Sequence, residues 1–255
     1  MLVAERLDWI LERLRFDYKL TIEEAVRELG ISPDTARRDF DRLAAQKLVR
    51  RTHGGVVATE SSVTWAPYSS FGQRAAERAE QKRRIAIAAR ELVQPGETIA
   101  VDAGSTAFHF ARLLGEVPCT VLAYSLEIGS AVLEHENAQL FISGGLVRRE
   151  TQSAVGEESI AMLKRFQAGT AFIGANAIND ECEVMTPNHM EAAVKRALIE
   201  ISDRAVLLAD SSKVGRRALS RFADMGEFAV MITDDGIEQK AAERIRARGV
   251  ELIVV

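Results

Sequence analysis

Residues 21–57 read TIEEAVRELGISPDTARRDFDRLAAQKLVRRTHGGVV, and this stretch decides the fold of the N-terminal part of the chain. Thr21 and Glu24 have the spacing of a capping box, in which two free backbone N–H groups at a helix start are satisfied. Apolar residues then recur at the helical spacing i, i+3, i+4 and i+7, and Gly30 stands where a left-handed residue can end the helix. Ser32 suits the cap of a second helix. The stretch therefore predicts two helices joined by a tight turn.

The second helix is predicted to have two unlike sides. Its inward stripe is apolar and consists of Ala36, Phe40 and Leu43. Its other side and its start carry groups that can reach DNA phosphates and base edges: Ser32, Thr35, Arg38 and Arg42, with Arg37 on a flank. This division is typical of the recognition helix of a helix-turn-helix.

The sequence after this helix predicts a basic wing. Residues 48–57 read as strand, Gly-Gly turn and strand, and they carry Arg50, Arg51 and His53. Two helices with a short turn can also be a plain helical hairpin. A third amphipathic helix upstream and the wing downstream favour a winged helix-turn-helix instead. Residues 33–55 hold six Lys or Arg against three Asp, whereas the whole chain is formally −4. We therefore predict that this local positive patch binds double-stranded DNA.

The composition is that of an ordinary globular protein, with 47% hydrophobic and 27% charged residues in a chain of 255. The two cysteines and four histidines show no metal-ligand spacing, so neither a metal nor a cofactor is expected. The N-terminus does not resemble a signal peptide, and no apolar run reaches the ~20 residues that span a bilayer. The expectation is a cytoplasmic protein with no membrane partner.

The chain is predicted to contain two domains, residues 1–58 and 71–255, joined by a Ser-, Thr- and Pro-rich linker at 59–70. Five basic residues crowd residues 71–84, at the start of a helix expected to end at 95–96. This run is either a second phosphate-contacting patch or the solvated face of a helix, and the sequence leaves both interpretations open.

Beyond residue 96, short apolar runs alternate with helical patterns. The expected strands are residues 98–101, 119–123, 139–143, 170–174, 205–209, 228–233 and 251–255. The expected helices are residues 107–114, 126–133, 157–166, 190–201 and 237–248. Continuous apolar strands separated by helices predict a three-layer α/β domain whose sheet is mostly parallel and covered on both faces.

Four of the predicted strands end in polar or Gly-rich sequence: residues 102–106, 143–145, 174–177 and 210–213. Ligands of open α/β sheets bind beyond the carboxyl ends of the strands. Small residues bring backbone N–H groups close to an anion, and Lys213 adds a positive charge. Any one of these loops can be a structural turn, but together they favour a polar, anionic ligand. Glu191 and Lys195, at i and i+4 on a helix, are either a surface ion pair or part of the site.

The ordered motifs resemble the DeoR family of bacterial transcription regulators over nearly the whole chain. The motifs are Thr35 to Phe40 in the reader helix, Arg50 to Gly55 in the wing, Asp102 to Thr106, Gly144-Gly145, Glu191 to Arg196, and Asp210 to Lys213. The resemblance implies a C-terminal domain related to sugar-phosphate isomerases and deaminases that senses phosphorylated sugars. The implied effector site contains Asp102, Gly104, Ser105, Thr106, Ser125, Gly144, Gly145, Glu191, Asp210 and Lys213. The family usually carries Thr-Asn-Ser/Asn where this chain has Ala123-Tyr124-Ser125.

The resemblance implies a regulator, expected to be a repressor of a carbohydrate operon, that a phosphorylated sugar releases from operator DNA. Specific binding by one small reader normally requires a second copy, so a homo-oligomer, dimer or tetramer, is expected. One alternative is an enzyme in which Asp102, Glu191, Asp210 or Lys213 retains isomerase-like acid–base chemistry. The acidic cluster of such isomerases is missing from the chain, which argues against it. A redox sensor is the other alternative, but no basic cluster lies near either cysteine to activate it.

Overall fold

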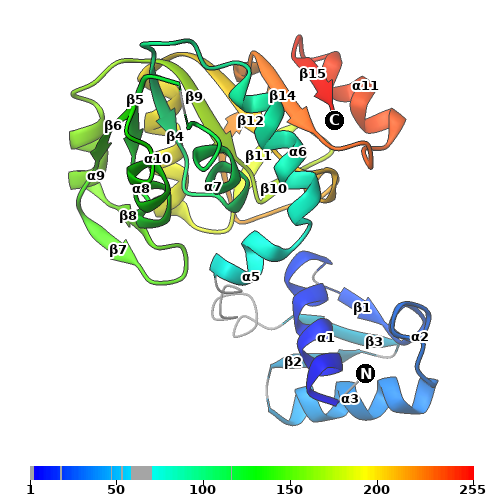
Figure 1. Cartoon of the computed structure of the whole chain (residues 1–255). Coiled ribbons are helices and arrows are strands. Elements are labelled where there is room, and N and C mark those ends of the chain that lie inside the picture. Colours follow the sequence, from blue (N-terminus) through cyan, green and yellow to red (C-terminus); the bar gives the residue numbers. More distant parts are fainter. Residues whose placement is uncertain (1–2, 18, 47, 53, 59–70, 116) are drawn as a thin grey trace. The chain divides into compact units, whose positions relative to one another are not determined.

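A computed structural model describes residues 3–17, 19–46, 48–52, 54–58, 71–115 and 117–255 (Figure 1). The chain divides into two compact units, Met1–Pro67 and Tyr68–Val255. Each unit has buried apolar clusters of its own. The expected linker, residues 59–70, and the wing residue His53 lie outside the described residues.

The first unit packs three helices against a small sheet. Its elements are α1 (Val3–Asp17), β1 (Lys19–Thr21), α2 (Ile22–Leu29), α3 (Pro33–Ala45), β2 (Val49–Thr52) and β3 (Gly55–Ala58). The capping box forms as predicted, because Thr21 N donates to Glu24 at 2.8 Å and Glu24 N donates to the Thr21 hydroxyl at 3.2 Å. Gly30 ends α2 with φ of 63°. The predicted winged helix-turn-helix is confirmed.

The wing is larger than the sequence predicts. The predicted strand, turn and strand form as β2 and β3, but β1 also joins the sheet in the order β1-β3-β2, with Leu20 opposite Val56. Three residues directly before a helix are too few to show an alternating pattern. The close approach of β1 explains Gly55, because a Cβ on that residue would lie 2.1 Å from the carbonyl oxygen of Leu20.

The second unit is built on seven parallel strands in the order β15-β14-β12-β9-β4-β5-β6. Their bounds are β4 (Thr98–Val101), β5 (Cys119–Ala123), β6 (Ala138–Ile142), β9 (Ala168–Gly174), β12 (Ser202–Leu208), β14 (Val230–Thr233) and β15 (Glu251–Val254). All seven predicted strands are therefore present and belong to this one sheet. The chain order reverses beside β4, because successive strands first add on its β5 side and then on its β9 side.

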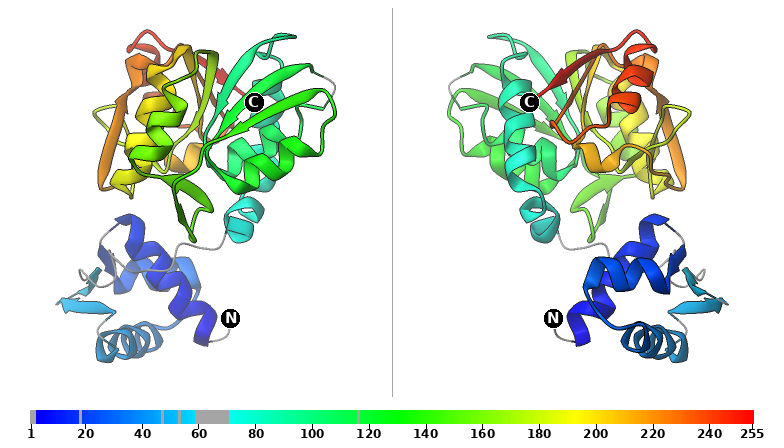
Figure 2. Two further views of the ribbon diagram at one scale, coloured as in Figure 1. Left: turned by 90° about the vertical axis from the view of Figure 1, so that its left-hand side faces the viewer. Right: turned by 90° about the vertical axis from the view of Figure 1, so that its right-hand side faces the viewer.

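Helices cover both faces of the sheet, so the predicted three-layer fold is confirmed (Figure 2). One cluster of buried residues unites α6 (Ala79–Arg90), α7 (Ser105–Ala111) and α8 (Leu126–Leu133) with Ile99 and Val101 of β4. The other unites α9 (Glu157–Leu163), α10 (His189–Glu200) and α11 (Gln239–Arg246) with Ala100, the residue between them. Successive strand residues thus point to opposite layers.

Two features of this unit differ from the sequence prediction. The single helix expected from residue 71 is two helices, α5 (Phe71–Ala76) and α6, because Arg78 adopts a left-handed backbone with φ of 50°. Several short elements that the sequence does not predict are also present. These are the β7-β8 hairpin (Leu146–Arg148 and Ser153–Val155), a sheet of β10 (Ala177–Ile178), β11 (Glu183–Thr186) and β13 (Ser220–Asp224), and the 3-10 turns η1 (Ser211–Lys213) and η2 (Met225–Glu227).

Candidate functional site

Helix α3 presents the predicted reader side chains on its exposed side. Ser32 caps the helix by accepting from Thr35 N at 3.2 Å. Ala36, Phe40 and Leu43 are buried as expected. Arg38 and Arg42 are exposed, and within the described part of the chain neither side chain has an ion-pair or hydrogen-bond partner. These two guanidinium groups are therefore available to a ligand.

The other predicted basic residues are held differently. Arg37 is exposed and pairs with Asp34 at 2.7 Å, one turn back on the same helix. Arg51 is half-buried, pairs with Asp41 at 2.9 Å, and donates to the carbonyl oxygen of Gly55 at 3.0 Å. Arg50 is exposed. Arg51 thus braces the wing against α3, whereas Arg50 is the freer of the two.

Asp39 is one of the three Asp residues in the charge count for residues 33–55, but it does not lie on the exposed face of α3. It is 3% exposed and accepts from Arg6 of α1 at 2.7 and 3.2 Å. The signal in the sequence is its place on the inner stripe, three residues after Ala36 and next to Phe40. Neutralising Asp39 inside the fold leaves the outer face of α3 more positive than the residue count suggests.

Two of the predicted loops of the second unit, those after β4 and β9, meet where the strand order reverses. Asp102 follows β4 and is fully buried. Its carboxylate accepts from Gly174 N at the end of β9 at 2.8 Å, from the Tyr124 hydroxyl after β5, and from the Lys195 ammonium on α10. Burial and the Asp102 charge raise the pKa of Tyr124 well above its usual value. Tyr124 is therefore a neutral donor that helps to fix Asp102.

Glu191 and Lys195 are not a surface ion pair, so that interpretation is wrong. Both are 5% exposed, and each has partners on other elements. Glu191 accepts from Arg148 at 2.5 Å and from Thr151 at 2.8 Å. Lys195 donates to Asp102 and, at 3.0 Å, to the carbonyl oxygen of Gly174. The i, i+4 spacing places both side chains on the inner side of α10.

The small residues of the loops allow these close approaches. A Cβ on Gly174 would lie 3.1 Å from Asp102 Oδ2. Gly104 is the N-cap of α7, with Ser105 half-buried and Thr106 buried in its first turn. Gly145 has φ of 133°, whereas Gly144 has no neighbour within 4 Å of a built Cβ.

Ser125 has a local structural role. It is fully buried, caps α8, and accepts from Ile128 N at 3.4 Å. Its hydroxyl is therefore not presented to a ligand in the way that the resemblance implied for this position.

The Asp210–Lys213 loop is not an exposed turn, because Asp210 is 1% exposed. Asp210 accepts from Ser212 N at 3.1 Å and pairs with Arg78 at 3.3 Å. Arg78 also donates to Asp234 at 3.1 Å. Lys213 is half-exposed, and within the described residues its ammonium has no hydrogen-bond or ion-pair partner. Sequence reasoning missed Asp234, although it follows β14 as the other loop residues follow their strands.

The basic run of residues 71–84 mostly faces the protein, so neither interpretation of it describes the run as a whole. Lys82 is buried and donates to the carbonyl oxygens of Arg74 and Glu77, the latter at 2.5 Å. Burial and the nearby Lys213 lower the pKa of Lys82 to about 8. Arg84 pairs with Asp235 at 2.8 Å. Arg78, at the junction of α5 and α6, thus contacts the loops after β12 and β14. Arg84 of α6 contacts the loop after β14.

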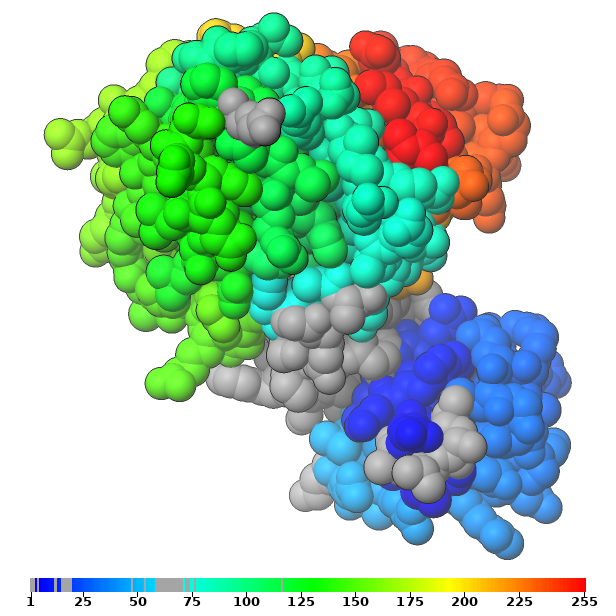
Figure 3. Space-filling view, viewed as in Figure 1, coloured from blue at the N-terminus to red at the C-terminus, as the bar shows by residue number. Residues whose placement is uncertain are grey.

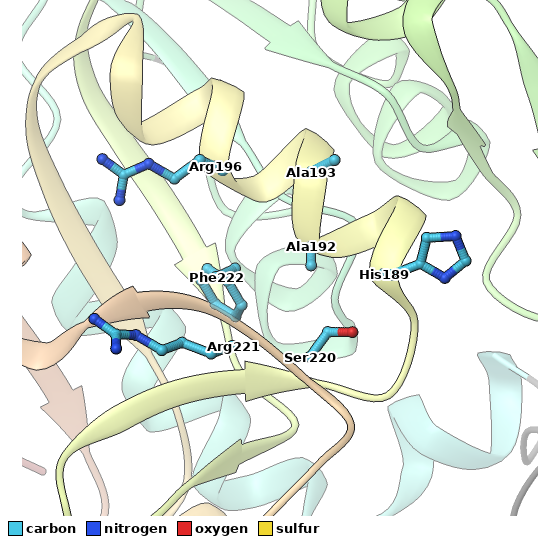
Figure 4. A pocket seen from close by; sticks show the side chains of 7 residues that line it. All are labelled: His189, Ala192, Ala193, Arg196, Ser220, Arg221 and Phe222. Atoms are coloured by element: carbon cyan, nitrogen blue, oxygen red, sulfur yellow. The ribbon is translucent and has the colours of Figure 1, made fainter.

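An open hollow of about 390 Å³ lies elsewhere, between α10 and β13 (Figure 4). It is lined by His189, Ala192, Ala193, Arg196, Ser220, Arg221 and Phe222. Its lining contains none of the predicted effector residues, and Arg196 is held by Glu227 and Glu200. We therefore do not assign it a role.

No group of three or more His, Cys, Asp and Glu side chains is placed to hold a metal ion in the described part of the chain. None of the helices described is both long and apolar enough to cross a membrane.

Two family models match the sequence. The DeoR-like helix-turn-helix domain matches residues 6–62, and the DeoR C terminal sensor domain matches residues 77–235. The fold and these matches define a DNA-binding transcription regulator with a sensor domain. The chain belongs to the DeoR family.

Two curated relatives and one solved structure illustrate the likeness. The putative aga operon transcriptional repressor of Escherichia coli O157:H7 is 32% identical over 253 residues, covering 99% of this chain and 94% of that protein. The glycerol-3-phosphate regulon repressor of Escherichia coli K12 is 28% identical over 232 residues, covering 91% and 90%. A ribose 5-phosphate isomerase from Methanocaldococcus jannaschii aligns with a TM-score of 0.41 and 21% identity, over 53% of this chain and 54% of that one. Both relatives are named as regulators, so the chain is a regulator and the enzyme alternative is set aside.

Proposed function

We propose that this chain represses a carbohydrate operon and that a phosphorylated sugar, bound in the second unit, releases it from operator DNA. The relatives named for the aga operon and for the glycerol-3-phosphate regulon support a role in carbohydrate metabolism. Operator DNA and a metabolite effector are both found in the cytoplasm, where we expect the protein to act. The proposed effector site is the row of loops at the carboxyl edge of the parallel sheet.

The charge balance of these loops carries the proposal. Among the buried carboxylates, Asp102 pairs with Lys195 and Glu191 pairs with Arg148, while Asp210 and Asp234 share Arg78. Lys213 is the cationic side chain of the loops that remains without such a partner among the described residues. An ammonium that no described carboxylate holds favours an anion.

The spacing of the loops suits a phosphorylated sugar. Lys213 follows β12 and Ser105 follows β4, and these strands are separated only by β9. Two strand spacings are roughly 10 Å, which is comparable to the length of a small phosphorylated sugar. Ser105 and the backbone N–H groups after Gly104 supply donors at one end, and Lys213 supplies charge at the other.

The proposed DNA contacts come from α3 and the wing. Arg38 and Arg42 are exposed cations on the helix that a winged helix-turn-helix places in the major groove. Arg fits the acceptors of guanine with two hydrogen bonds, which gives base specificity. We expect Ser32, Thr35, Arg37 and Arg50 to contact backbone phosphates.

Arg78 offers a route by which the effector site reaches the segment that leads to the DNA reader. Its side chain bridges Asp210 and Asp234, at 3.3 and 3.1 Å, while its left-handed backbone separates α5 from α6. Helix α5 is the first described element after residues 59–70. A ligand that shifts the loop after β12 therefore changes the support of α5. We propose that this change alters how two readers in a homo-oligomer are spaced.

Calorimetry with the full chain tests the effector proposal. We expect measurable binding of a phosphorylated sugar chosen from a thermal-shift panel, and much weaker binding of the same sugar without phosphate. Lys213→Ala should weaken phosphosugar binding, whereas Lys240→Ala, which removes an exposed lysine from α11, should not. Equal affinity for the sugar and its phosphate would contradict the proposed anion site.

A further inference from the structure

The open edge of the large sheet carries an unusual concentration of exposed apolar side chains. Of the ten exposed large hydrophobic residues among those described, six lie on α8, β6 and β7. We call this surface the β6 edge patch, and it consists of Leu126, Leu133, Phe141, Ile142, Leu146 and Val147. The three elements lie close together on one side of the unit, at the left in Figure 1 and in green in the space-filling view (Figure 3).

Strand β6 is the end of the seven-stranded sheet. It pairs with β5 alone, so its outer row of N–H and C=O groups is unpaired within the sheet. Its sequence, AQLFI, contains none of the charges or prolines that usually protect an edge strand from pairing with another chain. The strand is also mostly exposed. These properties make β6 a template for a further strand.

The neighbouring helix extends the apolar surface. Gly129 of α8 packs on β6, because a Cβ there would lie 3.0 Å from Ile142 Cδ1 and 3.5 Å from Leu140 Cδ2. Leu126 and Leu133 flank Gly129 on the same side of α8, at helical spacing. On the other face of the strand, Phe141 contacts Phe166, with ring centroids 5.0 Å apart, and is still 41% exposed. Apolar side chains therefore lie on both faces of β6 beside its free edge.

The exposed apolar area approaches that of a standard interface. If a fully exposed large apolar side chain presents about 200 Å², the six residues expose roughly 600 Å² per copy. A standard interface buries about 800 Å² on each partner, including polar rim atoms. The apolar part alone thus approaches what a stable dimer needs, and it equals the largest patches found on typical monomers.

We propose that the β6 edge patch joins two copies of this chain, with β6 of one copy pairing antiparallel to β6 of the other across a two-fold axis. A two-fold axis perpendicular to the sheet makes adjoining edge strands antiparallel and uses the same patch on both copies.

This inference deepens the proposed function, on which it rests, by naming the surface that brings two DNA readers together. Its test does not depend on DNA or effector. If the protein is oligomeric through another surface, the β6 proposal fails while the proposed regulation stands. If the phosphosugar fails to bind, the oligomeric state can still be measured and is unaffected.

Analytical ultracentrifugation of the full chain provides the test. We expect wild type to be an oligomer, and Phe141→Glu to raise the dissociation constant of this contact by roughly 30-fold or more, the effect of losing a central anchor. Because Phe141 also contacts Phe166, Leu133→Glu provides a second variant whose side chain is 73% exposed. Leu219→Glu, at a 77% exposed position outside the patch, is the matched control and should leave the oligomer unchanged.

Amide hydrogen exchange locates the contact independently. Residues 138–147 should exchange slowly in wild type and faster in Phe141→Glu and Leu133→Glu, while α10 stays protected in all three. A monomeric wild type would overturn the proposal. So would an oligomer that both patch variants leave intact, or one that the Leu219→Glu control dissociates equally.

Discussion

Lys195 on α10 donates a hydrogen bond to Asp102 in the loop after β4, across 93 residues of sequence. Both side chains are buried, and the same ammonium also donates to the carbonyl oxygen of Gly174. The contact ties one helical layer to the loops of two adjacent strands, β4 and β9, where the strand order reverses. The shape of the proposed effector site therefore depends on a buried ion pair.

Breaking this pair should destabilise the second unit. Lys195→Met leaves the Asp102 charge buried without its cation, and we expect a loss of about 3–5 kcal/mol in the free energy of unfolding. The double variant Asp102→Asn/Lys195→Met should lose less than the sum of the two single variants. Urea denaturation measures these values.

Lys164→Met is the matched control for the buried pair. Lys164 pairs with Glu200 at 3.1 Å, but both side chains are about half-exposed, so its loss should cost at most about 1 kcal/mol. Equal losses in the free energy of unfolding for Lys195→Met and Lys164→Met would show that the buried Asp102–Lys195 pair stabilises the fold no more than an exposed pair does.

The reader helix makes a prediction about specificity. Arg38→Ala should lose about 1–3 kcal/mol of operator binding and relax the preference at one base position, because Arg38 is exposed and free to contact a base. Arg37→Ala should instead weaken binding to all sequences alike and reduce the salt dependence. Fluorescence anisotropy with operator and scrambled duplexes distinguishes the two effects. Unchanged operator affinity in Arg38→Ala, with its fold intact by circular dichroism, would remove Arg38 from the interface.

Two adjacent glycines in the wing should respond differently to alanine. Gly55→Ala introduces a Cβ 2.1 Å from the backbone of β1, and we expect a loss of about 1–3 kcal/mol or more in stability of the first unit. A Cβ on Gly54 meets nothing within 4 Å, so Gly54→Ala should change stability by no more than about 0.5 kcal/mol. Thermal denaturation of both variants provides the comparison. If Gly55→Ala were as stable as wild type, β1 would not pair closely with β3.

Lys82 gives the second unit a specific pH dependence. Its pKa is about 8 in the fold, below the 10.5 of an unperturbed lysine, so the unfolded chain binds more protons between these two pH values. The contribution of Lys82 to the free energy of unfolding should therefore rise as pH increases from about 8 to 10.5. Lys82→Met should abolish that part of the rise, as measured by urea denaturation at several pH values. Parallel pH profiles for Lys82→Met and wild type would contradict the lowered pKa.

The inner strands of the large sheet could be predicted because each contains a continuous apolar run, and such runs occur where both faces of a sheet are buried. The small elements could not. β1, β7 and β8 have three residues each, and β10 has two, which is too short for a pattern to stand out. Helix propensity also predicted the wrong structure at Arg78, where one continuous helix was expected. There the backbone adopts a left-handed conformation that is rare for arginine, and the side chain contacts Asp210 and Asp234.

The candidate site could be predicted in its loops but not in its pairings. Strand ends and small residues are visible in the sequence, and they identified Asp102, Gly174 and Asp210. The i, i+4 rule pairs Glu191 with Lys195 because it considers one helix alone. In the fold their partners come from distant elements, Arg148 for one and Asp102 for the other.

The central claim is that a phosphorylated sugar and operator DNA oppose each other on one protein. Linkage requires that operator weakens effector binding by the same factor by which effector weakens operator binding. The most direct measurement is calorimetric titration of the phosphosugar into the full chain, with and without saturating operator duplex. We predict an affinity about 5–150-fold weaker on the operator, the range of a typical coupling of about 1–3 kcal/mol. Equal affinities would show that this ligand does not couple the two units, and tighter binding on DNA would make the protein an effector-assisted DNA binder.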